Sequence, residues 1–435
     1  MLPTRSDLGT APFQVLRDTH GSGLRVIAVR MPHAHQAVVE VVVRVGSRFE
    51  TEQQIGISHF LEHMLFRGTE RHPSAHELAL AFEQRGACLG AATAVDHSAL
   101  TLSAPPENLE QVLPWLGEIV RAPLLSGLEV ERGIVREEIL EMLDERGKWI
   151  DASTLVRREC FREHPLGWPI TGGLEQIERF GRMELVTHHR AHYTNVGTVI
   201  AVAGPVDPDR ILPAVAAAFA GLPSGALPAS TPPGPLRSPG FTYVHHTASQ
   251  TALALAFRAA GDLHPDEPST ELLMRLLDDG MSTRLYHRIC DERGLCYGVS
   301  ASYEAYHDSG LVELGAETAH ENAVELVREF IAVLRSVRDE GPLPGELEKA
   351  QARHRWQLQE MLDDPASVAE FHALGELLGV ARDPEERLRQ LDQVTPQELR
   401  RAAESTLQGQ QLAAVAVGSL PRRDQEALAA MVREF

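Results

Sequence analysis

Two histidines and one glutamate lie within a single pentapeptide, because His59, Glu62 and His63 form the pattern H-x-x-E-H. On a helix, side chains four residues apart lie one above the other, so His59 and His63 share a face that Glu62 borders. Imidazole nitrogens and carboxylate oxygens bind zinc, and a catalytic zinc takes three protein ligands and leaves its fourth position for water. The pattern therefore predicts a metal site that still needs a third protein ligand.

The helix that carries these residues must pack its other side on a core. Apolar side chains recur at the i, i+3, i+4, i+7 and i+8 positions after Gly56. We predict that this stripe is buried while the opposite face presents the ligands; it consists of Ile57, Phe60, Leu61, Met64 and Leu65. The order of the motif is that of the inverted zinc peptidases. A helix with two solvated histidines is the alternative, and a third ligand would decide between them.

A third ligand is expected in residues 131–139, where Ile134, Val135 and Ile139, followed by Met142 and Leu143, form a helical apolar pattern. Glu131 and Glu138 are two turns apart, so both carboxylates lie on one face of this helix. Any one glutamate here also fits an ordinary charged helix surface, which includes Glu137, Glu141 and Glu145. Spacing alone does not choose among these carboxylates.

The order of the motifs resembles the pitrilysin, or M16, family of metallopeptidases, and within it the branch that is similar to mitochondrial processing peptidase. H-x-x-E-H is followed by E-R-x-x-V-x-x-E-I at residues 131–139. Further segments agree with the family in the expected order and extend the resemblance over nearly the whole chain: residues 22–26, 46–50, 66–69, 164–167, 192–193 and 202–207.

Carried over residue by residue, the resemblance implies that His59, His63 and Glu138 bind one zinc ion per chain. It implies that Glu62 is the general base and that Glu131 is a carboxylate beside the metal. Zinc lowers the pKa of bound water toward about 7 and polarises the scissile carbonyl. A base such as Glu62 takes the proton of this water and passes it to the leaving amine. A carboxylate beside a ligand histidine fixes its tautomer, which is the role expected of Glu131.

Composition limits the partners and the compartment. The chain has 435 residues, 43% of them hydrophobic, which is typical of a soluble protein with more than one domain. Its 61 acidic and 41 basic side chains give a net charge of −20, which disfavours nucleic acid and anionic lipid and suits either basic peptides or solubility alone. We expect no membrane span, since Pro213 interrupts the longest apolar segment. The amino terminus resembles neither a signal core nor a transit peptide, so we expect a cytoplasmic location, or a periplasmic one if a leader was removed.

The four cysteines are scattered along the chain, at Cys88, Cys160, Cys290 and Cys296, without a C-x-x-C motif. This spacing predicts no disulfide framework. We expect each of them to be a small buried residue.

A proline-rich segment, residues 222–240, predicts an extended linker between an N-terminal domain at 1–221 and a C-terminal domain at 241–435. Residues 36–44 and 250–258 both have the pattern of strands that precede a turn and a long helix, and the second of these helices, near 272–285, lacks H-x-x-E-H. We predict an α+β fold of two similar sandwiches, each a mostly antiparallel sheet flanked by helices. The resemblance implies that the first domain binds zinc and that the second is its metal-free duplicate.

The second half departs from the family. Members often carry L-R-E-K-x-G-L-A-Y, whose arginine and tyrosine contact the substrate and stabilise the tetrahedral intermediate. The matching residues 289–297 retain Tyr297 but have Cys290 in place of arginine. A thiol cannot donate the bidentate, charged hydrogen bonds of a guanidinium, and one lost oxyanion contact typically costs about 2.7–4 kcal/mol of transition-state stabilisation. Arg288 and Arg293 lie at the wrong offsets of a helix to replace it.

Three explanations follow from this departure. The chain is a weak peptidase by itself, or it pairs with a related subunit that lacks the zinc motif and supplies the arginine and tyrosine, or another arginine such as Arg284 takes the role. We favour the hetero-oligomer, with a homodimer as the alternative, because a complete zinc site accompanies an incomplete substrate-binding pair. The expected substrate is a peptide or an unfolded protein segment.

A second departure lies in residues 89–94, which read L-G-A-A-T-A where the family has L-N-A-x-T-S. The substrate is expected to add to this edge as an extra strand through main-chain hydrogen bonds, which depend little on sequence. Gly90 removes a side-chain amide near the metal, or it only marks a bulge or a tight bend.

Other function classes fit the sequence less well. Non-catalytic subunits of respiratory complexes share the family fold, but they have typically lost the zinc residues that this chain retains. A structural metal would need a fourth protein ligand, and neither His76 nor His97 has suitable spacing. The chain contains no G-x-S-x-G motif, which disfavours serine-hydrolase chemistry.

Overall fold

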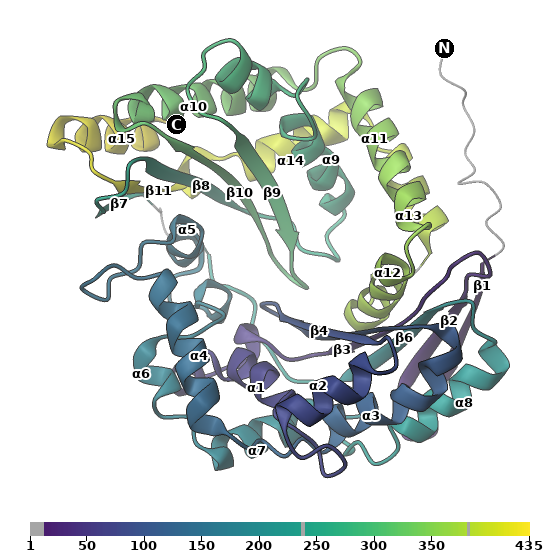
Figure 1. The fold of residues 1–435 in the computed structure, drawn as a ribbon. Coiled ribbons are helices and arrows are strands. Elements are labelled where there is room, and N and C mark those ends of the chain that lie inside the picture. The colour runs from purple at the N-terminus through teal and green to yellow at the C-terminus, as the bar shows by residue number, and fades with distance from the viewer. Residues whose placement is uncertain (1–12, 236–239, 381–382) are drawn as a thin grey trace. The chain divides into compact units, whose positions relative to one another are not determined.

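The computed structural model describes residues 13–235, 240–380 and 383–435, which form two compact units. Unit 1 comprises the described residues up to Ile139 and those within Pro169–Ser230 and Leu358–Glu385. Unit 2 comprises Leu140–Trp168, the described residues of Thr231–Gln357, and Glu386–Phe435. Each unit has one sheet with helices packed on it (Figure 1), so the predicted α+β fold with two sandwiches is confirmed.

Unit 1 contains a six-stranded sheet in the order β1-β2-β6-β3-β5-β4. β2 and β6 are parallel, and all other neighbours are antiparallel. The two central strands are apolar and buried along their whole length, which is typical of strands covered on both faces. The strands are β1 Gln14–Thr19, β2 Arg25–Arg30, β3 Ala37–Val43, β4 Cys88–Thr93, β5 Ser98–Ala104 and β6 Thr198–Gly204.

The helices of unit 1 come mostly from the first half of the chain. α12, Pro365–Leu378, is the exception: it packs on β3 and β6 although it belongs to the second half (Figure 1). The others are α1 Ile57–Leu65, α2 Ala75–Glu83, α3 Leu109–Arg121, α4 Leu128–Glu141, α6 Leu174–Ile177, α7 Arg182–His192 and α8 Pro208–Ala218.

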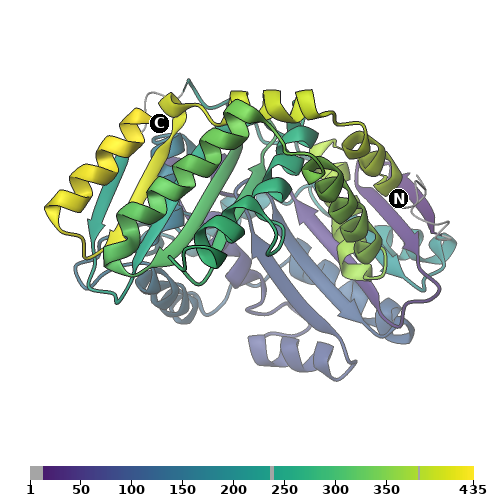
Figure 2. The same cartoon turned by 90° about the horizontal axis from the view of Figure 1, so that it is seen from above.

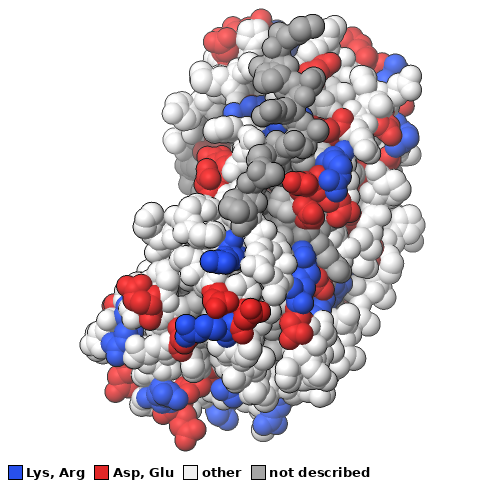
Figure 3. All heavy atoms as spheres, turned by 90° about the vertical axis from the view of Figure 1, so that its right-hand side faces the viewer, with Lys and Arg blue, Asp and Glu red and all other residues white. Residues whose placement is uncertain are grey.

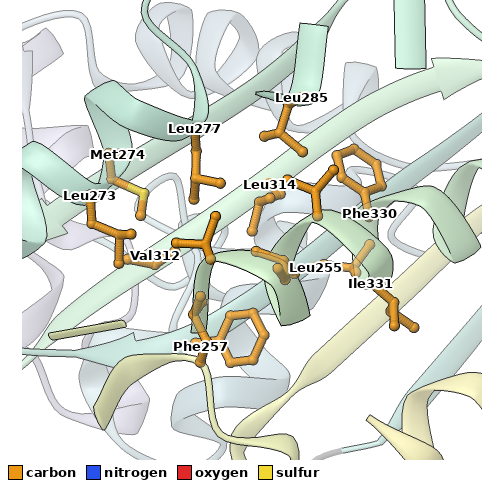
Figure 4. Close-up of a cluster of buried hydrophobic side chains, with 14 of the residues drawn as sticks. Leu255, Phe257, Leu273, Met274, Leu277, Leu285, Val312, Leu314, Phe330 and Ile331 are labelled. Carbon is orange, nitrogen blue, oxygen red and sulfur yellow. The ribbon is translucent and has the colours of Figure 1, made fainter. Parts of the chain in front are cut away.

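Unit 2 contains a five-stranded sheet in the order β7-β11-β8-β10-β9, with only β7 and β11 parallel. Helices α10 and α15 cover one face of this sheet (Figures 1 and 2). Figure 4 shows the core between strands and helices, where Phe257, Leu314 and Phe330 are fully buried. The strands are β7 Phe241–His245, β8 Thr251–Ala259, β9 Val299–Ala305, β10 Gly310–Thr318 and β11 Ala413–Gly418. The helices are α5 Ala152–Phe161, α9 Glu267–Leu277, α10 Ala323–Glu340, α11 Glu346–Met361, α13 Pro384–Asp392, α14 Pro396–Thr406, α15 Arg422–Glu434 and a π-helix at Tyr286–Asp291.

The two sheets follow one plan. Without β1, the order β2-β6-β3-β5-β4 of unit 1 matches the order β7-β11-β8-β10-β9 of unit 2, including the single parallel pair. The predicted strands at 36–44 and 250–258 are β3 and β8, which occupy equivalent places. The predicted duplication is therefore present in the topology.

Each half of the chain contributes one helix to the sheet of the other unit. α5 packs on β8 and β11 of unit 2, while α12 packs on the equivalent strands β3 and β6 of unit 1. The predicted division into 1–221, 222–240 and 241–435 remains a proposal about the covalent halves, and the compact units differ from it by this exchange. Residues 222–235 of the predicted linker contain no helix or strand, and 236–239 lie outside the described residues, as does the amino-terminal segment 1–12.

Two local predictions are wrong. The helix expected near 272–285 ends at Leu277, and a separate helical segment begins after a turn that contains Gly280. The expectation that every cysteine is buried holds only for Cys160, because Cys88 is exposed and Cys290 and Cys296 are half-buried. All four cysteines are free.

The surface carries charged side chains of both signs (Figure 3). On the face drawn in Figure 3, basic side chains lie among acidic ones, so that face has no purely acidic patch. Among the described residues, no helix has the length and the apolar character needed to cross a membrane.

One buried carboxylate makes the stability of unit 1 depend on pH. Glu40 lies in the middle of β3, where its Oε2 accepts a hydrogen bond of 2.7 Å from Thr101 Oγ1 on β5. Burial raises the pKa of Glu40 to about 7, against the lowering effect of the Thr101 hydroxyl. The folded state therefore binds a proton at a pH where the unfolded chain has released it.

We predict that replacing Glu40 changes this pH dependence. Since its folded pKa is raised, its contribution to the free energy of unfolding is fully present below about pH 4.5 and is lost as pH rises through about 7. Glu40→Gln should therefore gain stability relative to the wild type over this range, by at most about 1.4 kcal/mol per pH unit. Urea unfolding of both proteins from about pH 5 to about pH 8 measures this difference in the free energy of unfolding. The exposed Glu107→Gln is the control. A difference that does not change with pH would contradict the prediction.

Candidate metal centre

Helix α1 begins after Gly56, a position where the neighbouring backbone at Thr171 and Gly172 leaves no room for a side chain. Gly56 has φ +91°, and a Cβ there would lie 2.6 Å from Gly172 Cα and from Thr171 O. Gly56 has no side chain to cap the helix, so Glu50 does this instead: its carboxylate accepts hydrogen bonds from the backbone N–H groups of Gly56 at 2.8 Å and Ser58 at 2.9 Å. Burial raises the pKa of Glu50 to about 7, against the lowering effect of these two backbone hydrogen bonds. Its ionised form also interacts favourably with the helix dipole. Glu50 thereby determines where α1 begins.

The predicted buried face of α1 is confirmed. The apolar stripe is completely inaccessible to solvent at Ile57, Phe60, Leu61, Met64 and Leu65. Glu62 and His63 are half-buried, and His59 is only 8% exposed. The histidines are therefore not on a solvated face.

Three side chains converge on one point between α1 and α4. Ligand atoms of His59, His63 and Glu138 all lie within 4.8 Å of one another, and the structure describes no other group of three such side chains this close. His59 Nε2 lies 3.4 Å from Glu138 Oε1, and His63 Nε2 lies 3.6 Å from Glu138 Oε2. Ligand atoms in a tetrahedral zinc site are about 3.3–3.5 Å apart, given bonds of about 2.0–2.2 Å. The donor set and its spacing therefore fit a zinc ion.

Glu131 lies on the far side of the His63 ring. Its Oε1 accepts a hydrogen bond of 2.9 Å from His63 Nδ1, and its Oε2 lies 3.3 Å from Nη1 of Arg67. A neutral His63 that donates from Nδ1 to Glu131 has an unprotonated Nε2 on the side of Glu138, and this is the tautomer that binds a metal. Both carboxylates on α4 thus lie near His63, which agrees with the prediction that they share one face of the helix.

Helix α4 differs from its predicted apolar pattern. Val135 and Ile139 are buried, but Ile134 is 48% exposed. Met142 and Leu143 follow the last residue of the helix, Glu141. The buried face of α4 also includes a polar residue of the site, since Glu131 is only 6% exposed. The buried face of α4 is therefore less apolar than the sequence pattern predicts.

Glu62 is held by the edge strand of the sheet. Its Oε2 accepts a hydrogen bond of 2.7 Å from Thr93 Oγ1, at the end of β4. Tyr193, at the end of α7, is fully buried, and the nearby Glu62 charge adds to the effect of burial in raising the pKa of its hydroxyl. The Tyr193 hydroxyl and the His59 Nδ1 have no hydrogen-bond partner among the described residues.

The carboxylates around His63 raise the pKa of its imidazole. The hydrogen bond to Glu131 raises the pKa of His63, and the charges of Glu62, Glu131 and Glu138 add to this against the effect of burial. The hydrogen bond from His59 lowers the pKa of Glu138. The site is therefore an electronegative group of bases, which favours a divalent cation.

β4 is the outer strand of the sheet and packs against α1. Its register with β5 is continuous from Cys88 to Thr93, so the interpretation of Gly90 as a bulge is wrong. A Cβ at Gly90 would contact nothing within 4 Å, so the glycine leaves open space beside the strand.

The remaining predicted residues belong to unit 2. Tyr297 follows the π-helix, and its side chain is fully exposed. Cys290 lies within that helix. The Arg284 guanidinium bonds to Glu346, Ser336 Oγ and Gly341 O, so it is already used within unit 2.

Arg288 and Arg293 are engaged as well. Both pair with Glu329, which is buried, and Arg293 also pairs with Glu325. None of the arginines near Cys290 therefore presents a free guanidinium in this arrangement.

Four residues of the site were not assigned a role from the sequence: Glu50, Arg67, Thr93 and Tyr193. Each of them lies in a segment that resembles the family, so the signal was present without a stated function. The roles of Glu50, Arg67 and Thr93 became visible only through their contacts to residues of α1 and α4. Tyr193 was found through the effect of the Glu62 charge on its pKa.

The chain is similar to known proteins over most of its length. Residues 25–172 match the family described as insulinase (peptidase family M16), and residues 179–353 match the peptidase M16 inactive domain. The chain is 32% identical over 426 residues to an uncharacterized zinc protease of Mycobacterium tuberculosis, with 95% of this chain and 96% of the relative covered. It is 27% identical over 370 residues to an uncharacterized zinc protease of Bacillus subtilis, with 84% and 88% covered.

Solved structures show the same fold. A protease from Helicobacter pylori has a TM-score of 0.85 at 20% identity, covering 94% of this chain and 100% of that one. A chain of complex III2 from Candida albicans has a TM-score of 0.77 at 17% identity, covering 95% and 100%. The matches to both M16 models and the similarity to zinc proteases over almost the full length show that this chain belongs to the M16, or insulinase, peptidase family.

Proposed function

We propose that this chain is a zinc-dependent endopeptidase that hydrolyses peptides or unfolded protein segments. The observation that carries the proposal is the convergence of His59, His63 and Glu138, with Glu62 and Glu131 beside them. Family members that serve only as structural subunits have no need of such a set. A zinc ion bound there would supply a Lewis acid that polarises a carbonyl and acidifies water.

In this proposal, Glu62 is the general base. Thr93 holds one carboxylate oxygen of Glu62 by a hydrogen bond, which restricts its rotation and fixes its direction beside the two histidines. A positioned carboxylate can take a proton from water and return it to the leaving amine. Glu131 keeps Nε2 of His63 available, and Arg67 neutralises the second oxygen of Glu131.

The edge strand β4 supports a mode of substrate binding. An extended peptide can add to an outer strand through main-chain hydrogen bonds, with little dependence on sequence. β4 is such a strand, and its Thr93 contacts the proposed base. A peptide aligned on β4 would thus run beside Glu62, and the open space at Gly90 would accept a bulky side chain.

We further propose that a related subunit completes the substrate-binding site. Cys290 stands in place of the signature arginine, and Arg284, Arg288 and Arg293 are all held in ion pairs. Tyr297 alone remains exposed. A hetero-oligomer in which the second chain supplies arginine and tyrosine fits these observations, and a homodimer would not supply the missing arginine.

Glu62→Gln tests the proposed base. The amide retains the shape and the contact to Thr93 but cannot accept a proton, so kcat should fall by at least about 100-fold while zinc content stays unchanged. Peptide hydrolysis and metal analysis of the purified chain, with its partner subunit where one is found, measure both quantities. Glu70→Gln, on the exposed surface after α1, is the control. Retention of activity by Glu62→Gln would mean that the mechanism has to be abandoned.

Glu131→Gln tests whether Glu131 orients the His63 ring for zinc binding. Loss of the carboxylate that bonds His63 Nδ1 should weaken zinc binding about 10- to 100-fold. Competition with a zinc chelator measures the affinity without any need for catalysis. Glu137→Gln on the same helix is the matched control, because Glu137 is exposed. Equal zinc affinity for wild type and Glu131→Gln would remove Glu131 from the metal site.

Activity of the isolated chain tests the need for a partner. We expect the purified protein to bind about one zinc per chain but to cleave peptides slowly, because one oxyanion contact is missing. Cys290→Arg should raise kcat/KM at least about 10-fold, since such a contact is worth about 2.7–4 kcal/mol. Cys290→Ser, which removes the thiol without adding charge, is the control. High turnover by the isolated wild type at stoichiometric zinc would contradict the hetero-oligomer.

A further inference from the structure

Two of the four cysteines lie close together in unit 2. The Sγ atoms of Cys290 and Cys296 are 3.7 Å apart, and both residues are half-buried. Cys290 belongs to the π-helix Tyr286–Asp291, and Cys296 follows the turn after it. The sequence spacing does not resemble a redox motif, so this pairing is a product of the fold.

The segment between the two cysteines can adjust its shape. Residues 291–294 are exposed, and Gly294 makes the turn with φ +58°. A Cβ at Gly294 or Gly298 would meet nothing within 4 Å, so the chain on either side of Cys296 is not tightly packed. The sulfurs need to approach by only about 1.7 Å to reach a disulfide bond length of about 2.05 Å.

Both side chains border the same apolar core, which keeps them facing each other. Cys290 and Cys296 pack against the buried cluster that Figure 4 shows in part. Thr318 Oγ1 on β10 donates a hydrogen bond of 2.6 Å to Leu295 O, which holds the chain beside Cys296. The other two cysteines differ in position, since Cys88 is exposed on β4 of unit 1 and Cys160 is buried in α5.

We propose that Cys290 and Cys296 form a reversible intrachain disulfide that restrains the turn carrying Tyr297. Two S–H bonds break and one S–S bond forms, and two protons and two electrons pass to an oxidant such as a small-molecule disulfide, which is reduced to two thiols. Dithiothreitol reverses the step by the same exchange. The inference does not rest on the proposed peptidase activity, because neither zinc nor a peptide takes part in it.

The disulfide would act on the residue next to it. Tyr297 follows Cys296 directly, and its fully exposed side chain is not held by packing. The closed ring would fix the backbone on the N-terminal side of Tyr297, whereas the reduced turn remains free to rearrange. Burial raises the pKa of both thiols, that of Cys296 to about 12, so thiolate attack is slow near neutral pH and the reaction is best measured at equilibrium.

Trypsin makes the bond directly observable, because Arg288 and Arg293 flank Cys290 and place a cleavage site between the two cysteines. The full-length chain carrying Cys88→Ser is incubated to equilibrium with oxidised glutathione, denatured, alkylated and digested without reduction. Peptides 289–293 and 294–328 should then appear in mass spectra as one joined species that lacks two hydrogens. Dithiothreitol should separate them, and neither Cys290→Ser nor Cys296→Ser should give the joined species.

Restraint of the turn is measured separately on the folded protein. Cleavage after Arg293 by native-state trypsin should slow at least fivefold in the oxidised chain and recover on reduction, while Cys290→Ser cleaves at one rate in both states. Free thiols at both positions, or separate glutathione adducts on each, would overturn the disulfide. A joined species without any change in native cleavage would overturn the restraint of Tyr297.

Discussion

The contact between α1 and α4 through the His63 ring is the interaction on which the site depends. His63 donates from Nδ1 to Glu131 and turns Nε2 toward Glu138, so one imidazole links two carboxylates that lie two turns apart. The apolar stripe of α1 is fully buried and prevents rotation of the helix, while Glu50 determines where it begins. Together these contacts hold His59, Glu62 and His63 in one direction before any metal binds, which lowers the cost of assembling the site.

The two units share one strand order but differ in the helix that follows the equivalent strands β3 and β8. The helix after β3 carries the candidate ligands His59 and His63, whereas α9 after β8 packs apolar side chains into its core. The exchange of α5 and α12 means that neither sheet is covered by its own half of the chain alone. Each half therefore needs the other to bury its central strands, which makes the stability of each half depend on the other.

The segment around Cys290 shows how the same scaffold can be altered locally. This segment contains a π-helix, two neighbouring thiols on the border of an apolar core, and an exposed Tyr297. The surrounding arginines do not compensate, because their guanidinium groups neutralise Glu329 and Glu346. π-helical turns frequently occur at functional sites, so a change of function here is consistent with the backbone.

The sequence by itself determined the helix of H-x-x-E-H, its buried stripe, the α+β class and the duplicated strands, because helical and strand periodicities are local properties of the chain. It also placed Glu131 and Glu138 on one face, but spacing alone could not select Glu138 from its acidic neighbours. The family resemblance implied Glu138, and the tertiary structure brings its carboxylate to 3.4 Å from His59 and 3.6 Å from His63. The exchange of α5 and α12, the anchoring of Glu62 by Thr93 and the pairing of Cys290 with Cys296 were likewise decided by packing. Such contacts join segments whose relation no local pattern encodes.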